Sequence, residues 1–418
     1  MLRPPNPARA RAVAVVCSTY PPIMGGVETY NHHVAHALAR AGCRVAVATR
    51  FVRARAPGGM AGLLGRSEPH QRLAEPDGVR VEVMTPRPAF LLRPVYRLHF
   101  YPSTVGLAAR LFGAAHRDGL ARALDGAEAV HYSGTGRELL GFAALRHARR
   151  KGIPFIVTTH LHTGAWGDGP VDFALYRRAD AVLAATEYER SFVVRNGVDP
   201  ARVHVLGHGV NVDGSGDGAR FRGQHGLGEA PIVLFLARKA RYKGYGLLRE
   251  AAPLVWARVP EARFVFAGPS EDGAPTPPND DARMIDLGVL KDHEREDAYA
   301  ACTAFCVPSE AESFGLAYLE AWRYARPVVA LGIPTVAELV GGAGGGLLAE
   351  PTAASIADAL VDLLTNPVRA AALGAAGARR ADGSTWDHVA RRLLQIYADP
   401  AGALAERANV AAPEPAFA

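Results

Sequence analysis

The sequence predicts an α/β protein with two Rossmann-like domains, each built on a parallel sheet. In the first half of the chain, short β-branched runs alternate with helical patterns, as in a parallel sheet with crossover helices. A Gly- and Asp-rich stretch at 211–228 interrupts the apolar periodicity, and the same alternation restarts after it. At 418 residues and 49% hydrophobic composition, the chain is too long for one compact core and has enough apolar residues for two. We therefore expect domains at 1–212 and 213–385.

The individual elements follow from the same patterns. In the N-terminal domain we expect strands at residues 12–18, 44–49, 79–84, 129–132, 154–158, 181–184 and 203–206. In the C-terminal domain we expect strands at 231–237, 262–267, 303–307 and 327–330, and late helices at 352–365, 367–379 and 387–398. Residues 54–77 read as an irregular insertion, and 401–418 as a loose tail. Because open parallel sheets bind ligands beyond the carboxyl ends of their strands, we expect the site between the two domains.

Composition limits the function classes. The formal net charge of +6 is too small to require a nucleic-acid partner, but it suits anionic ligands and an acidic membrane surface. No apolar run is long enough to span a membrane, and residues 1–20 read better as a first buried strand than as a signal peptide. The four cysteines lack a Cys-x-x-Cys spacing, which favours buried thiols in a reducing compartment over a metal or redox role. We therefore expect a cytoplasmic protein.

The most informative stretch is a strand, turn and helix at 303–329. A β-rich run enters a Pro-Ser turn and a polar loop, and a helix begins near Gly315 and ends before Pro327. Glu312 lies in the loop and Glu320 is eight residues on, at most about 12 Å of helical rise. The two carboxylates can therefore reach opposite ends of one extended ligand. Since a vicinal diol suits a two-oxygen acceptor, we expect Glu320 to bind the ribose of a nucleotide.

Between these glutamates, the backbone N–H groups of Phe314, Gly315 and Leu316 form a helix N-terminus, which is a natural phosphate site. The full pattern, Ser-x-x-Glu-x-Phe-Gly-Leu-x-x-Leu-Glu-Ala followed by Pro-Val-Val, resembles the signature of retaining glycosyltransferases of the GT4 family, which have the GT-B fold. The resemblance implies a nucleoside diphosphate sugar as donor, with Glu312 holding a hydroxyl of the donor sugar. It also implies that a last helix at 386–400 crosses back onto the N-terminal domain. An alternative is that Glu312 only caps the helix.

A basic turn follows the first strand of the C-terminal domain. In Ala-Arg-Lys-Ala-Arg-Tyr-Lys-Gly, Arg238 and Lys243 are five residues apart beside a helix start, where they can neutralise a pyrophosphate whose charge grows as the sugar leaves. The pair is similar to the Gly-Arg-x4-Lys-Gly pattern of GT4 enzymes, although Ala237 stands where a glycine is usual. The alternative is a solvated basic turn. Further along, backbone groups near Leu290 are expected to contact the base.

Two segments of the N-terminal domain complete the predicted site. Gly25 and Gly26, in a strand-to-helix turn, allow close backbone approach to a ligand. They resemble the Pro-Pro-x-x-Gly-Gly loop of GT4 enzymes, which implies contact with the donor's distal phosphate and the acceptor. His160 ends a buried strand in a Thr-x-His pattern similar to that of the family, which implies a place beside the sugar and acceptor. His162 and His131 are weaker candidates, since a strand-end histidine is more often a core residue.

The mechanism expected from these residues needs no metal or other cofactor. No Asp-x-Asp sequence occurs, so fixed positive charge and helix amides would stabilise the leaving diphosphate. The leaving phosphate oxygen can take the acceptor's proton, and retention of configuration is implied by the family. We expect a hexose-type sugar, with UDP-sugar favoured as donor.

The acceptor is the open question. Residues 86–101 mix arginines with aromatic and aliphatic side chains, which suits either a loop packed on the N-terminal core or a weak peripheral contact with an anionic membrane that presents a lipid acceptor. A small soluble acceptor, such as a sugar, cyclitol or natural product, is the main expectation. Two other classes stay open. A GT-B nucleotide-sugar epimerase would share the cleft but need no acceptor, and a dinucleotide oxidoreductase fits the alternation, although no Gly-x-Gly-x-x-Gly follows the first strand.

Overall fold

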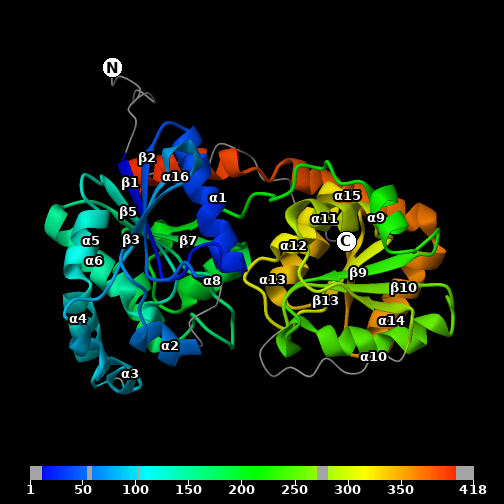
Figure 1. Cartoon of the computed structure of the whole chain (residues 1–418), viewed down its shortest axis with the longest axis horizontal. Coiled ribbons are helices and arrows are strands. Elements are labelled where there is room, and N and C mark those ends of the chain that lie inside the picture. Colours follow the sequence, from blue (N-terminus) through cyan, green and yellow to red (C-terminus); the bar gives the residue numbers. More distant parts are fainter. Residues whose placement is uncertain (1–11, 54–58, 102, 271–280, 402–418) are drawn as a thin grey trace. The chain divides into compact units, whose positions relative to one another are not determined.

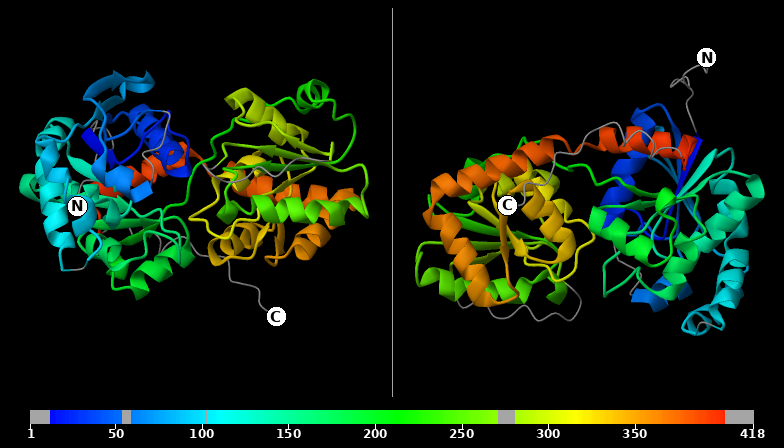
Figure 2. Two further views of the ribbon diagram at one scale, coloured as in Figure 1. Left: turned by 60° about the horizontal axis from the view of Figure 1, so that its bottom comes forward. Right: turned by 180° about the vertical axis from the view of Figure 1, so that it is seen from behind.

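The computed structural model describes residues 12–53, 59–101, 103–270 and 281–401. The chain forms two compact units (Figure 1). Unit 1 comprises Met1–Gly207 together with Trp386–Ala418, and unit 2 comprises His208–Thr385. Each unit has a central sheet with helices on both faces, as two further views show (Figure 2). The fold is therefore α/β with two parallel-sheet units.

Unit 1 is organised around an eight-stranded sheet in the order β3-β4-β2-β1-β5-β6-β7-β8, in which all neighbours are parallel except β3 and β4. The central strand β1 is buried along its whole length, and its Val13 lies between Val45 of β2 and Ala129 of β5. Strands buried on both faces read as continuous apolar runs, which explains why the sequence reveals them. The strands are β1 Ala12–Cys17, β2 Arg44–Thr49, β3 Gln71–Ala74, β4 Arg80–Val83, β5 Ala129–Ser133, β6 Phe155–Thr158, β7 Ala181–Ala184 and β8 Val203–Val205.

Helices cover both faces of this sheet, and the last one comes from the far end of the chain. In α16 (Trp386–Ala398), Trp386 stacks on His33 with 5.2 Å between ring centroids, and the Tyr397 hydroxyl lies 2.7 Å from Nδ1 of His131. Unit 1 therefore takes its core from both ends of the sequence. The other helices are α1 Gly26–Arg40, α2 Gly59–Gly65, η1 Pro76–Gly78, η2 Ala89–Leu92, α3 Val95–Leu98, α4 Val105–Ala115, α5 Arg117–Ala123, η3 Gly136–Glu138, α6 Leu140–Lys151, α7 Pro170–Tyr176, α8 Glu187–Arg195 and η4 Pro200–Arg202.

Unit 2 has a fully parallel six-stranded sheet in the order β11-β10-β9-β12-β13-β14. The strands are β9 Ile232–Leu236, β10 Arg263–Ala267, β11 Met284–Asp286, β12 Ala304–Cys306, β13 Val328–Leu331 and β14 Gly346–Ala349. The helices are α9 Gly218–Gln224, η5 Arg241–Lys243, α10 Tyr245–Trp256, α11 Asp292–Ala301, α12 Leu316–Arg323, α13 Pro334–Val336, η6 Ala337–Gly341, α14 Ala353–Thr365 and α15 Pro367–Asp382.

Trp322 fixes α12 within unit 2. The indole is fully buried and donates from Nε1 to the carbonyl of Gly345 at 2.8 Å. A side chain on Gly377 of α15 would lie 2.2 Å from the Trp322 ring, so α15 can pack this closely only with glycine at that position. The helix that carries Glu320 is therefore held against both the sheet and α15.

The structure differs from the sequence expectations at the edge strands of the sheets and at the boundary between the two units. The insertion predicted at 54–77 contains α2 and β3 among its described residues, and strands β11 and β14 were not predicted. β3, β11 and β14 are edge strands, partly exposed and short, so they lack the apolar run that marks a buried strand. The structure also places residues 208–212 in unit 2, because His208 packs on Phe314 and Val210 donates to the carbonyl of Ser384.

Two further expectations concern the cysteines and the end of the chain. All four cysteines are free and buried, as predicted. The loose tail predicted at 401–418 lies outside the described residues beyond Ala401. Within the described ranges, the helices are all too short or too polar to cross a bilayer.

Candidate active site

Parallel strands bring several predicted site residues to one edge of unit 2. β9 lies between β10 and β12, and β11 lies next to β10, so the carboxyl ends of all four strands meet at the same edge. Arg238 and Lys243 follow β9, Leu290 follows β11, and Glu312 follows β12. This is the edge at which open α/β sheets bind their ligands.

Lys243 and Glu312 form an ion pair at this edge. Their Nζ and Oε1 atoms are 2.6 Å apart, and the two side chains are only 17% and 10% exposed. The pairing spans 69 residues of sequence, and it depends on how closely the turn after β9 approaches the loop after β12. A charge-assisted bond in a partly buried site fixes both side chains.

The backbone holds these two loops together. The N–H of Glu310 and the hydroxyl of Ser309 both bond the carbonyl of Tyr242, at 2.8 and 3.1 Å. Gly244 has a positive φ of 72°, and a side chain there would lie 2.0 Å from the carbonyl oxygen of Pro308. Only glycine satisfies both requirements. The Lys243 turn and the Glu312 loop therefore form one rigid substructure.

The start of α12 is the second part of the site. Its N-cap residue is Gly315, in the left-handed region at φ 94°, which has no side chain to cap the helix, and the Glu312 carboxylate bonds Lys243 instead. The alternative that Glu312 is a cap is therefore wrong. Phe314 is buried, with its ring 4.5 Å from that of His208, and Leu316 opens the helix. The first N–H groups of a helix lie at the positive end of its dipole, which suits an anionic group.

Glu320 is buried rather than exposed, and its carboxylate is tightly held. The Tyr299 hydroxyl donates to Oε2 at 2.7 Å, and Asn211 donates from Nδ2 to Oε1 at 2.9 Å. Arg295 lies 3.8 Å from the same Oε1. Burial and the charge of Glu320 raise the pKa of Tyr299, so that hydroxyl stays a donor. Asn211 and Tyr299 were not predicted as site residues, because Asn211 lies in the presumed linker and Tyr299 is an ordinary helix residue.

A second lysine of the basic turn is buried. Lys239 pairs with Asp286 at the end of β11, and Asp286 also accepts from the N–H of Gly288 at 3.0 Å. This pair ties the turn after β9 to the segment that leads to Leu290, which is half-buried. Arg238, by contrast, has an exposed side chain. Neighbouring cations in the turn therefore have different surroundings, a distinction that the sequence does not show.

The carboxyl edge of unit 1 carries the remaining predicted residues. β1, β5 and β6 are neighbours, and His160 follows β6. His160 has a positive φ of 44°, uncommon for a residue with a side chain, and its Nε2 lies 2.7 Å from Oγ of Ser133. The Tyr30 ring packs edge-on against the imidazole at 5.0 Å. The position and orientation of this histidine are therefore set by residues of β5 and α1.

Gly25 and Gly26 follow β1 and begin α1. Gly25 is extended, and a side chain on Gly26 would meet nothing within 4 Å in the structure. Packing therefore does not require glycine at position 26. A close ligand approach remains the interpretation for this turn.

The two weaker histidine candidates have local structural partners. Nδ1 of His162 lies 3.0 Å from the carbonyl of His160, and its ring stacks on Trp166. His131 is fully buried, with Nδ1 at the Tyr397 hydroxyl and Nε2 2.7 Å from Oγ1 of Thr158. Burial lowers the pKa of His131 to about 3. His131 therefore joins β5 to α16 as a neutral core residue.

One acidic residue at this edge was not predicted. Glu138 follows β5, is half-buried, and accepts hydrogen bonds from the Ser18 hydroxyl and, at 3.0 Å, from the N–H of Thr135. Burial raises the pKa of Glu138 above its ordinary value. Its sequence context, Gly-Thr-Gly-Arg-Glu, gives no signal beyond a turn.

Comparison with known proteins gives a consistent picture. Residues 25–209 match a family model described as a glycosyl transferase 4-like domain, and residues 230–366 match one described as glycosyl transferases group 1. A D-inositol 3-phosphate glycosyltransferase of Frankia alni is 33% identical over 62% of this chain and 72% of its own length. A GDP-mannose-dependent alpha-(1-6)-phosphatidylinositol monomannoside mannosyltransferase of Mycolicibacterium smegmatis is 32% identical over 60% of this chain and 71% of its own.

Solved structures share the fold. Sucrose-phosphate synthase from Thermosynechococcus elongatus has a TM-score of 0.71 at 21% identity, covering 93% of this chain and 98% of that one. The Anabaena protein Alr3699/HepE, solved in complex with UDP-glucose, has a TM-score of 0.68 at 17% identity, covering 93% and 99%. At these identities the likeness concerns the fold alone.

Proposed function

The chain belongs to the GT4 family of glycosyltransferases, with the GT-B fold, and from that premise we propose that it transfers a hexose-type sugar from a UDP-sugar to a hydroxyl of a small soluble acceptor, with retention of configuration. The observation that carries the proposal is the rigid pairing of Lys243 with Glu312 at the carboxyl edge of unit 2. It places a cation and a carboxylate next to the start of α12.

Each residue has a defined part in the proposed reaction. Arg238 and Lys243, with the N–H groups at Phe314, Gly315 and Leu316, stabilise the diphosphate as it leaves. When the donor binds, Lys243 turns to the phosphate and Glu312 accepts from a hydroxyl of the sugar.

The ends of the donor have their own contacts. Glu320 binds the ribose, and backbone groups near Leu290 contact the base. In unit 1, the amides at Gly25 and Gly26 face the distal phosphate, and His160 lies by the sugar and the acceptor.

The bond changes balance without a protein base. The acceptor oxygen forms a bond to the anomeric carbon on the face from which the phosphate oxygen departs. The bond from that carbon to the phosphate oxygen breaks, and the phosphate oxygen takes the acceptor's proton. Because the developing negative charge meets fixed cations and amides, the proposed transfer needs no metal.

The substrate classes rest on the relatives. The Frankia protein's name gives an inositol phosphate as acceptor, which supports a cyclitol-type acceptor, and the Anabaena structure contains UDP-glucose, which supports a UDP-sugar donor. The free, buried cysteines suit a cytoplasmic enzyme. A panel of UDP- and GDP-sugars, assayed for released nucleoside diphosphate with and without cyclitol phosphates, tests both assignments. Release that requires the acceptor supports transfer, whereas conversion of the donor to another nucleotide sugar without acceptor would identify an epimerase.

The role of Lys243 gives the sharpest test. We expect Lys243→Ala to lower kcat/KM by a factor on the order of 100 to 1,000, as for loss of one preorganised charge-stabilising group. Lys151→Ala removes the same charge from an exposed position on α6 and should leave the rate unchanged. Thermal unfolding of both variants checks that they fold. A near-normal rate for folded Lys243→Ala would overturn the assignment.

A second candidate acceptor is a lipid. Phe90 of η2, and Phe100 and Tyr101 just after α3, are 60%, 58% and 65% exposed. The side chains of Arg93 and Arg97 in the same segment are also exposed. The name of the Mycolicibacterium relative gives a phosphatidylinositol mannoside as acceptor. The same segment also packs on the unit 1 core through buried Leu92 and Val95, as expected for a loop packed on that core. Sedimentation with anionic vesicles distinguishes the two acceptor classes.

A further inference from the structure

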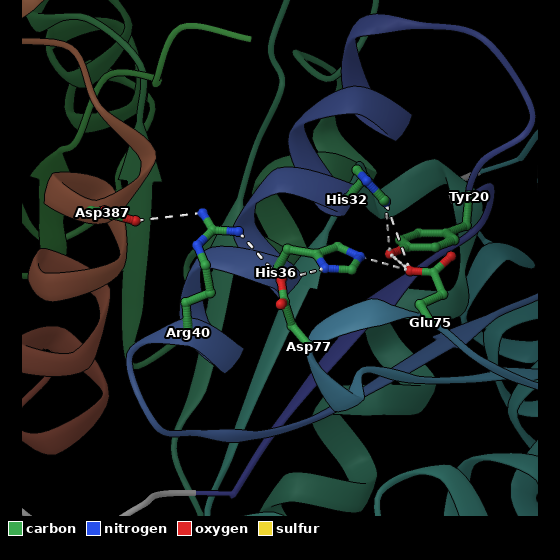
Figure 3. Close-up of polar contacts among 7 residues, drawn as sticks. All are labelled: Tyr20, His32, His36, Arg40, Glu75, Asp77 and Asp387. Carbon is green, nitrogen blue, oxygen red and sulfur yellow. Dashed lines mark hydrogen bonds and ion pairs between the residues drawn. The ribbon is translucent and has the colours of Figure 1, made fainter. Parts of the chain in front are cut away.

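A cluster of potential metal-binding side chains lies along α1, C-terminal to the Gly25–Gly26 turn. His32 and His36 are one helical turn apart on the same face of α1, and Glu75, between β3 and η1, reaches them (Figure 3). One ligand atom from each residue lies within 4.8 Å of the other two. In the part of the chain that the structure describes, no other group of three or more His, Cys, Asp or Glu side chains meets this geometry.

The distances fit a small transition-metal ion. Nε2 of His36 is 3.0 Å from Oε2 of Glu75, and Nδ1 of His32 is 3.7 Å from the same oxygen. Tetrahedral zinc with bonds of 2.0–2.1 Å separates neighbouring ligand atoms by roughly 3.3 Å, which lies between these two values. Two imidazoles and a carboxylate are also a donor set that suits zinc rather than magnesium or calcium, which prefer oxygen ligands alone.

The surroundings orient the ligands. Oδ2 of Asp77 lies 3.1 Å from Nδ1 of His36, which directs Nε2 of that ring towards Glu75. Carboxylate–histidine pairs of this kind commonly support a bound metal. The Tyr20 hydroxyl donates to Oε2 of Glu75 at 2.9 Å and lies 3.5 Å from Nδ1 of His32, so it contacts two of the candidate metal-ligand atoms (Figure 3).

The hydrogen bonds of His36 call for an additional positive charge. Both ring nitrogens face carboxylates, Nδ1 towards Asp77 and Nε2 towards Glu75. A neutral imidazole carries one N–H and can donate to only one of them. The arrangement is satisfied either by a second proton on the ring or by a cation between Nε2 and Glu75. The orientation of His32 towards the same carboxylate oxygen favours the cation.

We propose that His32, His36 and Glu75 bind one divalent transition-metal ion, with zinc as the preferred ion, which links α1 to the segment after β3. The site has a structural role. It fixes the helix that begins at Gly26, whereas the sugar transfer proceeds without it. The proposal is independent of the donor and acceptor assignments, because metal binding itself is measured.

The test uses the full chain after removal of metal by dialysis against a chelator. Titration with Zn²⁺ in competition with a chromophoric chelator should give one tight site per chain, and Co²⁺ should give the visible absorption of a tetrahedral site. The thermal midpoint should rise when zinc binds, since an ion that binds only the folded state stabilises it. Absence of a tight site in the wild-type chain would overturn the proposal.

Variants identify the ligands. Glu75→Gln and His36→Gln should lose the tight site and the Co²⁺ spectrum, and so should His32→Gln, whose 38% exposed side chain makes misfolding the least concern. His70→Gln is the matched control. It removes a histidine that also lies 3.2 Å from a glutamate, Glu82, but that glutamate is already paired with Arg72 and Arg122. Unchanged binding in His32→Gln, or equal losses in His70→Gln, would overturn the assignment.

Discussion

At Glu320, two donors from distant parts of the chain hold the carboxylate that the eight-residue spacing predicts as a ligand group. Asn211 lies 109 residues away and Tyr299 lies 21 residues away. Each carboxylate oxygen has one donor, and each can accept further bonds from a diol. The pair therefore preorganises Glu320 for the proposed ribose contact.

Removal of the Tyr299 hydroxyl tests this preorganisation. Tyr299→Phe leaves a buried carboxylate oxygen short of one donor, which should lower the free energy of unfolding by about 1–3 kcal/mol. Because Glu320 then loses its orientation, KM for the donor should rise several-fold with a smaller change in kcat. Urea unfolding and steady-state kinetics measure the two effects.

Tyr324→Phe is the control for this variant. Its ring stacks on that of Tyr299, and its hydroxyl bonds Glu296 instead of Glu320. This change should lower stability while the donor KM stays the same. Equal KM changes in both variants would show that general loosening of unit 2, rather than the Glu320 contact, is responsible.

The predicted site residues show how much of the candidate site can be predicted from the sequence. The spacing of Glu312 and Glu320 is local, so it can be read directly. The partners of the predicted residues, such as Ser133 for His160, are brought together by strand order, which no local pattern encodes. The basic turn predicted Lys243 as a phosphate ligand, but its pairing with Glu312 depends on two loops that meet only in the folded unit.

At the scale of elements, a polar contact joins α16 to the sheet of unit 1. Both ring nitrogens of His131 on β5 are hydrogen-bonded. Nδ1 bonds the hydroxyl of Tyr397 on α16, and Nε2 bonds the hydroxyl of Thr158 on β6. Its interaction with Tyr397 spans 266 residues of sequence. The neutral ring therefore forms part of the contact between the two segments of unit 1.

This contact makes unit 1 sensitive to acid. The pKa of His131 is about 3 in the folded chain, against 6.5 for an ordinary histidine. The unfolded chain therefore binds the proton first, and stability is lost as pH falls below 6.5. Between pH 7 and 5 the loss from His131 amounts to roughly 2 kcal/mol.

Urea unfolding at the two pH values measures this loss. His116 has a similarly lowered pKa of about 3, mainly through burial, and adds to it. The comparison is therefore between the wild type and His131→Gln, whose loss should be smaller by about 2 kcal/mol. The same pH dependence in both would refute the role assigned to His131.

At the scale of the whole molecule, the strands that could be predicted from the sequence are those that are buried in the sheets. The interior strands of both sheets were predicted from apolar runs, because parallel strands covered on both faces leave little room for polar residues. The missed strands all lie at sheet edges, where solvent contact relaxes that requirement. The α/β architecture could therefore be predicted from the sequence, whereas the edge strands β3, β11 and β14 could not.

The net charge and the exposed aromatic residues make the proposed lipid acceptor testable. With a formal charge of +6, we expect the chain to sediment with anionic vesicles at low ionic strength if it takes a lipid acceptor. Binding should be lost near 1 M salt, where screening acts within about 3 Å. Absence of sedimentation would exclude the lipid reading.

The aromatic contribution is tested by substitution. Phe90→Ser with Phe100→Ser should weaken sedimentation, since both side chains are exposed beside arginines. Val368→Ser is a matched control, because it removes an apolar side chain that is 85% exposed on unit 2. Equal effects would indicate adhesion without a defined surface.

The division of unit 1 between the two ends of the chain has a consequence for biosynthesis. A ribosome synthesises all of unit 2, His208–Thr385, before it makes the helix that covers α1 and His131. The first 207 residues must therefore wait, with part of their interior open to water, until the final segment emerges. Chaperones that shield apolar surface would find their target in the half made first, and a premature stop before Trp386 would leave that half permanently unfinished.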